Sequence, residues 1–194
     1  RPYGRCKKRV RILTQLFKKF KNCPKWAVFF YMSNNPIGFF DSGIGGVTLW
    51  KEVHSLLPYE NKIYLADSIN SPYGNKSDKE LEKISFKNSE FLLEKGCKLI
   101  IVACNTATTK CINKLRKKFN IPFIGIEPAI KPAALNTKTG KVGVLATEGT
   151  LGSDLFYKTS NKHAGSVKII EQSGKGLVPL IEQGKIDGDE IKNL

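Results

Sequence analysis

The sequence of 194 residues has no apolar run long enough to cross a membrane as a helix. Its longest run, residues 26–32, has seven residues, whereas a spanning helix needs about 20. The five cysteines are odd in number and include no Cys-x-x-Cys pair. This argues against a disulfide framework and a zinc site, and it favours a reducing, cytoplasmic setting. The remaining composition, 41% hydrophobic and 25% charged, is that of a globular protein and excludes wholesale disorder.

Acidic residues are missing from the first 35 positions. Residues 1–35 hold ten Lys or Arg and no Asp or Glu, so of the net charge of +15 only +5 belongs to residues 36–194. This basic leader could be a targeting segment, a nucleic-acid-binding arm, or upstream sequence before a true start at Met32, the only methionine. We favour the start at Met32, with residues 1–35 outside the native domain. The nucleic-acid-binding arm is the weaker alternative, because the aromatic residues of the leader have no regular spacing with its cations.

Short apolar runs alternate with amphipathic helical patterns from residue 36 onward. Strands are predicted at residues 36–40, 62–66, 98–103, 121–126, 141–146 and 167–170, and helices at 47–57, 77–95, 107–119, 129–135, 153–160 and 176–183. Ser77 and Glu80 predict a capping box at the start of the second helix. Residues 99–103 are all apolar, as expected of a parallel strand that is buried on both faces.

The alternation of strands and helices predicts an α/β fold of two parallel-sheet domains, residues 36–127 and 128–194. Polar clusters follow several of the predicted strands, namely Asp41-Ser42, Pro72-Tyr73-Gly74, Cys104-Asn105-Thr106 and Thr147 to Thr150. Ligands of parallel α/β sheets bind beyond the carboxyl ends of the strands. The sequence therefore predicts that these clusters face one crevice.

Cys104 follows a predicted buried strand and opens a helix. There the helix dipole and free N–H groups favour a thiolate, which predicts a depressed pKa and a role as base or nucleophile. The alternative is a small buried apolar residue. The adjacent polar pair Asn105 and Thr106 favours the functional interpretation, because buried polar groups need partners. Cys97 and Cys111 are expected to be structural.

The glycine-rich turn that begins at Asp41 matches neither common phosphate-binding pattern, and an acid at its mouth would repel phosphate. An acid and a hydroxyl there suit an ammonium group and a carboxylate. The alternative is a plain left-handed turn with an Asp N-cap. Tyr73 could instead be a loop tyrosine without a functional role, and Glu182 could be a solvated charge on a helix. His54 and His163 are expected at the surface.

Taken together, these motifs resemble those of the glutamate racemases, in the aspartate/glutamate racemase superfamily. The resemblance covers Pro36 to about Gly184 and rests on Phe40-Asp41-Ser42-Gly43-Ile44-Gly45-Gly46, Pro72-Tyr73-Gly74, Ala103-Cys104-Asn105-Thr106-Ala107, Gly125-Ile126-Glu127-Pro128 and Ala146-Thr147-Glu148-Gly149-Thr150. It implies two pseudo-symmetric α/β domains with the site between them. It also implies a cofactor-independent, metal-free enzyme that interconverts L- and D-glutamate for peptidoglycan in the bacterial cytoplasm, possible as a homodimer.

The resemblance assigns roles by position. Cys104 matches the first catalytic cysteine. Asp41 matches a substrate-binding position that also assists proton transfer, and Glu182 matches an acid that assists the opposite base. The other matched positions bind or contact substrate: Ser42, Tyr73, Gly74, Asn105 and Thr106, together with a threonine that is either Thr147 or Thr150.

One feature of the resembled family is missing. Its second catalytic cysteine stands in a Cys-Thr-His motif late in the second domain, and this sequence has no cysteine after Cys111. We therefore expect a truncated chain with an incomplete second domain that does not racemise. Two alternatives stay open: a racemase of the same superfamily that acts on aspartate, and a non-enzymatic protein that binds nucleic acid through its leader, with steep salt dependence.

Overall fold

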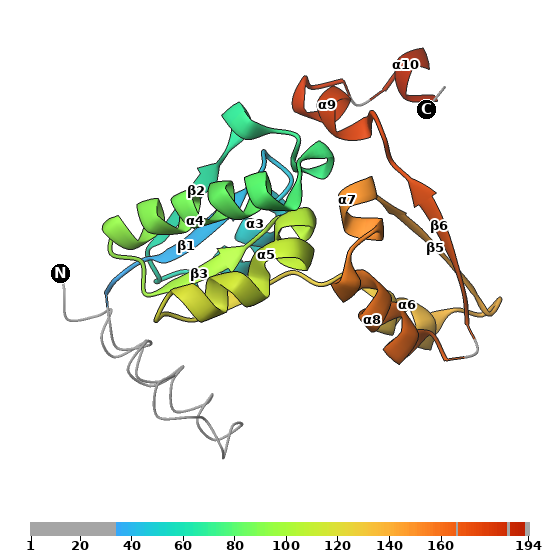
Figure 1. The fold of residues 1–194 in the computed structure, drawn as a ribbon, viewed down its shortest axis with the longest axis horizontal. Helices are drawn as coiled ribbons and strands as arrows, with labels where there is room; N and C mark the ends of the chain where they lie inside the picture. Colours follow the sequence, from blue (N-terminus) through green and yellow to red (C-terminus); the bar gives the residue numbers. More distant parts are fainter. Residues whose placement is uncertain (1–33, 166, 186, 193–194) are drawn as a thin grey trace.

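The computed structural model describes residues 34–165, 167–185 and 187–192, and it holds two parallel sheets with covering helices (Figure 1). The basic leader and Met32 lie outside the described residues, so the interpretations of that segment are untested. Within the described ranges, no helix is long and apolar enough to span a membrane.

The first sheet has four parallel strands in the order β2-β1-β3-β4. They are β1 (Ile37–Asp41), β2 (Lys62–Ala66), β3 (Leu99–Val102) and β4 (Phe123–Gly125). The strand predicted at 62–66 has those bounds, whereas the one predicted at 121–126 is shorter. Because β1 pairs with β2 on one side and β3 on the other, Asp41 and Cys104 emerge from adjacent strands at the same edge.

Three helices and two short 3-10 turns connect these strands: α3 (Val47–Leu56), α4 (Asp78–Glu94), α5 (Asn105–Lys118), η1 (Ser68–Asn70) and η2 (Tyr73–Asn75). The predicted capping box is confirmed, since Ser77 accepts from the Glu80 N–H while the Glu80 carboxylate accepts from the Ser77 N–H. Helices α4 and α5 lie side by side (Figure 1). Three ion pairs join them: Lys110–Asp78, Lys114–Glu82 and Lys118–Glu90.

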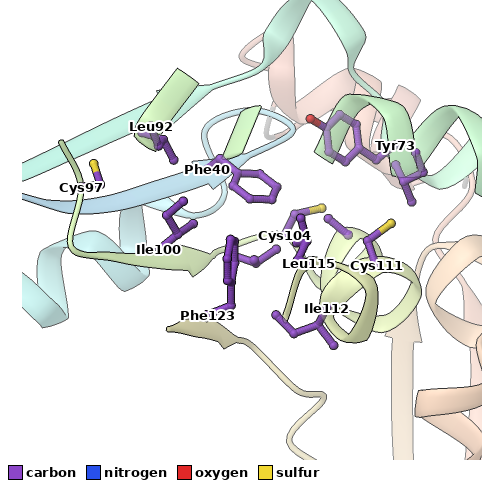
Figure 2. Packing of buried hydrophobic residues seen from close by; sticks show 13 residues of the cluster. Phe40, Tyr73, Leu92, Cys97, Ile100, Cys104, Cys111, Ile112, Leu115 and Phe123 are labelled. Carbon is purple, nitrogen blue, oxygen red and sulfur yellow. The ribbon is translucent and has the colours of Figure 1, made fainter. Parts of the chain in front are cut away.

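Both faces of the first sheet are covered, as predicted from its continuously apolar third strand. The larger cluster packs Phe40, Ile100 and Val102 against α4 and α5 (Figure 2). The smaller one contains Ile37, Phe39 and Ile101, with α3 over it. Helix α4 buries Leu81 and Leu92, whereas Phe91 is exposed.

The second unit contains α6 (Ile130–Asn136), β5 (Lys141–Ala146), α7 (Glu148–Leu151), α8 (Asp154–Ala164), β6 (Lys168–Ser173), α9 (Leu177–Glu182) and α10 (Asp189–Lys192). Its sheet has two parallel strands, β5 and β6. The single helix predicted at 153–160 is preceded by a second one, because Thr147 caps α7 and Ser153 caps α8. The fold is α/β with parallel sheets, as predicted; the boundary at residues 127–128 stays a prediction.

Candidate active site

A cavity of about 570 Å³ lies between the two units, beyond the carboxyl ends of β1, β3 and β5. The polar residues predicted for the site that line it are Asp41, Ser42, Cys104, Asn105, Thr106, Thr147, Thr150 and Glu182. Among the described lining residues only Asp41 and Glu182 are charged, and both are acids. The cavity therefore suits a ligand with a cationic group, provided that neutral donors meet any anionic group.

Cys104 is the thiol of this cavity. It is the N-cap residue of α5, and its Sγ donates to Ser42 Oγ at 3.9 Å. Burial raises the pKa of the Cys104 thiol to about 11, and the negative charge of Asp41 contributes to the rise. Hydrogen bonds from the Ala107 and Ser42 backbone and the Ser42 hydroxyl favour the thiolate but do not offset burial. The predicted depressed pKa is therefore wrong: loss of hydration outweighs the helix N-terminus.

The glycine-rich loop after β1 lies so close to neighbouring residues that a side chain at some of its glycines would meet them. Asp41 Oδ2 accepts from the Gly46 N–H at 3.0 Å. Positive φ angles occur at other described glycines but not at Gly43, Gly45 or Gly46, so a left-handed turn is not what selects glycine here. A Cβ at Gly46 would lie 2.6 Å from Ala103 Cβ, and one at Gly43 would fall on the Glu182 carboxylate. Close approach explains Gly46, whereas the atoms near Gly43 are the end of a flexible side chain.

Glu182 reaches this loop from α9, and its Oε1 accepts from the Ile44 N–H at 3.1 Å. On the other side of the loop the Tyr64 hydroxyl donates to the Gly43 carbonyl at 2.8 Å. Burial and the nearby acids Asp41 and Glu182 raise the pKa of Tyr64. Sequence reasoning missed Tyr64, because a contact to a backbone carbonyl leaves no motif.

Three threonine hydroxyls meet where the two units touch. Thr106 Oγ1 lies 2.9 Å from Thr147 Oγ1 and 3.2 Å from Thr150 Oγ1, and the last two are 3.2 Å apart. Hydroxyls both donate and accept, so the cluster can bind a carboxylate group as well as join α5 to α7. Asn105, at the first position of α5, lines the cavity and is exposed.

Tyr73 and Gly74 are not among the residues that line the cavity. The buried Tyr73 hydroxyl donates to Asp67 Oδ2 at 2.5 Å, and Asn88 donates to both. Burial, then the hydrogen bond to Asp67, raise the pKa of Tyr73. Gly74 packs on α7, where a Cβ would lie 2.9 Å from Thr147 Cβ. Their substrate-binding roles stay predictions. The position of Asp67 directly after β2 was the available signal for this network.

The remaining candidates have no contact with the cavity. Cys97 and Cys111 are buried in the core of the first unit, as predicted for structural residues. His54 is exposed and stacks on Trp50, whereas the side chain of His163 lies outside the described set. In the part of the chain that the structure describes, no three His, Cys, Asp or Glu side chains form a group that could hold a metal ion.

The fold and cavity define a class: an α/β protein with a site between two parallel-sheet units. The first unit supplies one thiol and one acid to this site, and the second unit supplies another acid. Residues 50–190 match the Asp/Glu/Hydantoin racemase family, and the chain belongs to that family.

Similar proteins agree with this assignment. The chain is 45% identical over 162 residues to a glutamate racemase of Herpetosiphon aurantiacus, covering 84% of this chain and 64% of that protein. The crystal structure of glutamate racemase isoform RacE1 from Bacillus anthracis has a TM-score of 0.73 at 33% identity, covering 82% of this chain and 60% of that one. A Francisella tularensis glutamate racemase in complex with D-glutamate has a TM-score of 0.70 at 33% identity, with the same coverages. The chain thus spans about three-fifths of the length of its curated relatives.

Proposed function

We propose that the cavity is a cofactor-independent glutamate racemase site in which Cys104 exchanges the α-proton. One observation carries this proposal: Cys104 Sγ, the Asp41 carboxylate and the Thr106–Thr147–Thr150 hydroxyls line a single cavity between the units. These groups match the parts of an α-amino acid. The acids suit its ammonium group, and the threonine hydroxyls suit a carboxylate.

The proposed step starts from a protonated thiol, because burial and Asp41 raise the pKa of Cys104. A substrate ammonium beside Asp41 offsets that negative charge and favours the thiolate, whose departing proton Asp41 accepts. The thiolate then removes the α-proton, and the electron pair of the C–H bond stays on the α-carbon. Hydrogen-bond donors around the carboxylate stabilise the charge that develops. Returning a proton from the Cys104 thiol to the same face completes an exchange without inversion.

Inversion needs a second acid on the opposite face of the α-carbon. The resembled family uses a second cysteine there, and this sequence has none after Cys111. We therefore propose that this 194-residue chain exchanges the α-proton of one glutamate enantiomer with solvent and does not racemise. In the organism, the activity of the family would supply D-glutamate for peptidoglycan.

The test is proton exchange in D₂O. The chain is incubated with L- or D-glutamate, loss of the α-proton signal is followed by NMR, and inversion is followed by chiral chromatography. We expect exchange with one enantiomer, no inversion, and a fall of about 100-fold or more in Cys104→Ser. Cys111→Ser is the matched control and retains exchange. A folded chain that exchanges neither enantiomer contradicts the proposal, and inversion contradicts its one-base form. Faster exchange with aspartate would move the assignment to the aspartate alternative.

A cytoplasmic location and a homodimer belong to the same proposal. The described cysteines Cys97, Cys104 and Cys111 are free, which supports a reducing compartment. Among the described strands, β5 and β6 each have one unpaired edge, and open edges favour association. Light scattering during size-exclusion chromatography tests the dimer: a constant monomer mass across protein concentrations contradicts it.

A further inference from the structure

The peptide group between Gly43 and Ile44 is held from both units. Its carbonyl oxygen, on Gly43, accepts from the Tyr64 hydroxyl at 2.8 Å. Its N–H, on Ile44, donates to Glu182 Oε1 at 3.1 Å. Tyr64 lies on β2 and Glu182 at the end of α9, so one peptide group links the two units.

The two hydrogen bonds reinforce one another. An amide that donates at one end and accepts at the other is polarised along its length, which strengthens both bonds. The Glu182 bond has an ionised acceptor, which makes it stronger than a neutral one. The fit is also tight: the Glu182 carboxylate occupies the place of a Cβ on Gly43, and the Tyr64 oxygen would lie 2.8 Å from a Cβ on Gly46. The loop is therefore packed against both side chains.

The held peptide is adjacent to the partner of the reactive thiol. Ser42 precedes Gly43, and its Oγ accepts from Cys104 Sγ at 3.9 Å. Ser42 also favours the Cys104 thiolate through its backbone and its hydroxyl, both of which lower the pKa of the thiol. A displacement of the peptide would carry these two donors away from the sulfur.

We propose that Tyr64 is a positioning residue for Cys104: together with Glu182 it fixes the Gly43–Ile44 peptide and so holds Ser42 against the thiol. This inference rests on the proposed function only in treating Cys104 as the reactive group. Other groups also interact electrostatically with the sulfur, namely Asp41, Tyr73 and Tyr64 itself, and the experiment has to separate their effect from the positioning of the Gly43–Ile44 peptide.

The test measures alkylation of Cys104 in the intact chain. Iodoacetamide is added at pH 8.5, and the Cys104 peptide is quantified by mass spectrometry. In Tyr64→Phe we expect the rate to fall about threefold to tenfold, as for a thiol whose pKa is about 0.5 to 1 higher. Tyr157→Phe, an exposed tyrosine on α8, is the matched control and keeps the original rate.

A second reagent separates thiolate formation from access. N-phenylmaleimide is larger than iodoacetamide, so a wider cavity entrance changes the ratio of the two rates, whereas a smaller thiolate fraction lowers both equally. We expect an unchanged ratio. Thermal unfolding followed by circular dichroism checks that each variant is folded.

Glu182 provides the other half of the test. Glu182→Ala removes the acceptor of the Ile44 N–H and should lower the Cys104 rate as Tyr64→Phe does. Glu182→Gln keeps an accepting oxygen and should retain most of the rate. Cys104 rates within twofold of the original in both Tyr64→Phe and Glu182→Ala overturn the proposal. A higher rate in both Glu182 variants also overturns it, because Glu182 would then act on the sulfur through its charge alone. Because no turnover is measured, a failed α-proton exchange would reject the proposed function without affecting this result.

Discussion

The two units of the molecule differ in how much apolar surface they bury. Among the described residues, the first unit supplies every buried apolar side chain except Ile130 and Phe156. Strand β3 is enclosed on both faces, whereas Leu145 of β5 is 62% exposed. Because burial of apolar surface is the main stabilising contribution to folding, the first unit has the more stable core, and the second relies more on its contact with the first.

That contact is also the site. Helix α7 packs on η2 and α5, and α8 packs on α5, while the threonine cluster and the Glu182–Ile44 hydrogen bond cross between the units. One wall of the cavity is therefore a rigid sheet edge that carries the thiol. The other wall has few buried apolar contacts of its own, which is typical of regions with low local stability.

The largest expected effect is a cavity in the first core. Leu115 is fully buried on α5, and Leu115→Ala should lower the free energy of unfolding by about 3 kcal/mol. Leu145→Ala, at an exposed position, should change it by less than about 0.5 kcal/mol. Urea denaturation measures both. Equal losses would show that the second unit has a core comparable to the first.

A smaller effect is expected where the units touch. A Cβ at Gly149 would lie 2.9 Å from the Gly74 carbonyl oxygen, whereas one at Gly143 has open space. Gly149→Ala should cost about 1–2 kcal/mol after the gain in helix propensity that alanine brings, and Gly143→Ala is the control. Hydrogen exchange should accelerate in α7 and α8 while β1 and β3 stay protected. Acceleration spread evenly over both units would contradict a separable second unit.

The smallest effect concerns the two acids, one from each unit. Below pH about 11 Cys104 is mostly protonated, so its alkylation rises about tenfold per pH unit. The Asp41 charge raises the pKa of Cys104, so Asp41→Asn should lower that pKa and increase the rate about threefold to tenfold at pH 8.5. Glu182→Gln should change it much less. An unchanged or slower rate in Asp41→Asn would mean that the charge of Asp41 does not act on the sulfur.

Much of the fold follows from apolar runs of the right length. The strands at 62–66 and 141–146 were predicted with their observed bounds, because each run is bordered by polar or turn residues. The helix predicted at 153–160 corresponds to α8 (Asp154–Ala164), whereas α7 was missed, since its start depends on the cap Thr147 rather than on hydrophobic spacing.

The candidate site was predictable in location but not in detail. The rule that ligands bind at strand ends predicts that Asp41, Cys104 and Thr147 lie at one site, and all three line the same cavity. The pKa of Cys104 could not be predicted, because burial depends on packing from both units. The hydrogen bonds of the Tyr73 hydroxyl with Asp67 and Asn88 could not be predicted either, because these residues meet only after the chain has folded.

The hydrogen bond from Ile44 to Glu182 spans 138 positions of sequence, and this has a consequence for the newly made chain. Contacts of such long range form late in folding, after their loop-closure entropy has been offset by local structure. Glu182 follows Cys104 by 78 residues, which a ribosome adding about 5–20 residues per second needs about 4–16 s to synthesise. During that interval the sheet edge that carries Cys104 can already exist while α9 does not. The thiol is then more open to oxidants and electrophiles than it is in the finished cavity, so part of its chemical protection begins only when β6 and α9 have joined the first unit.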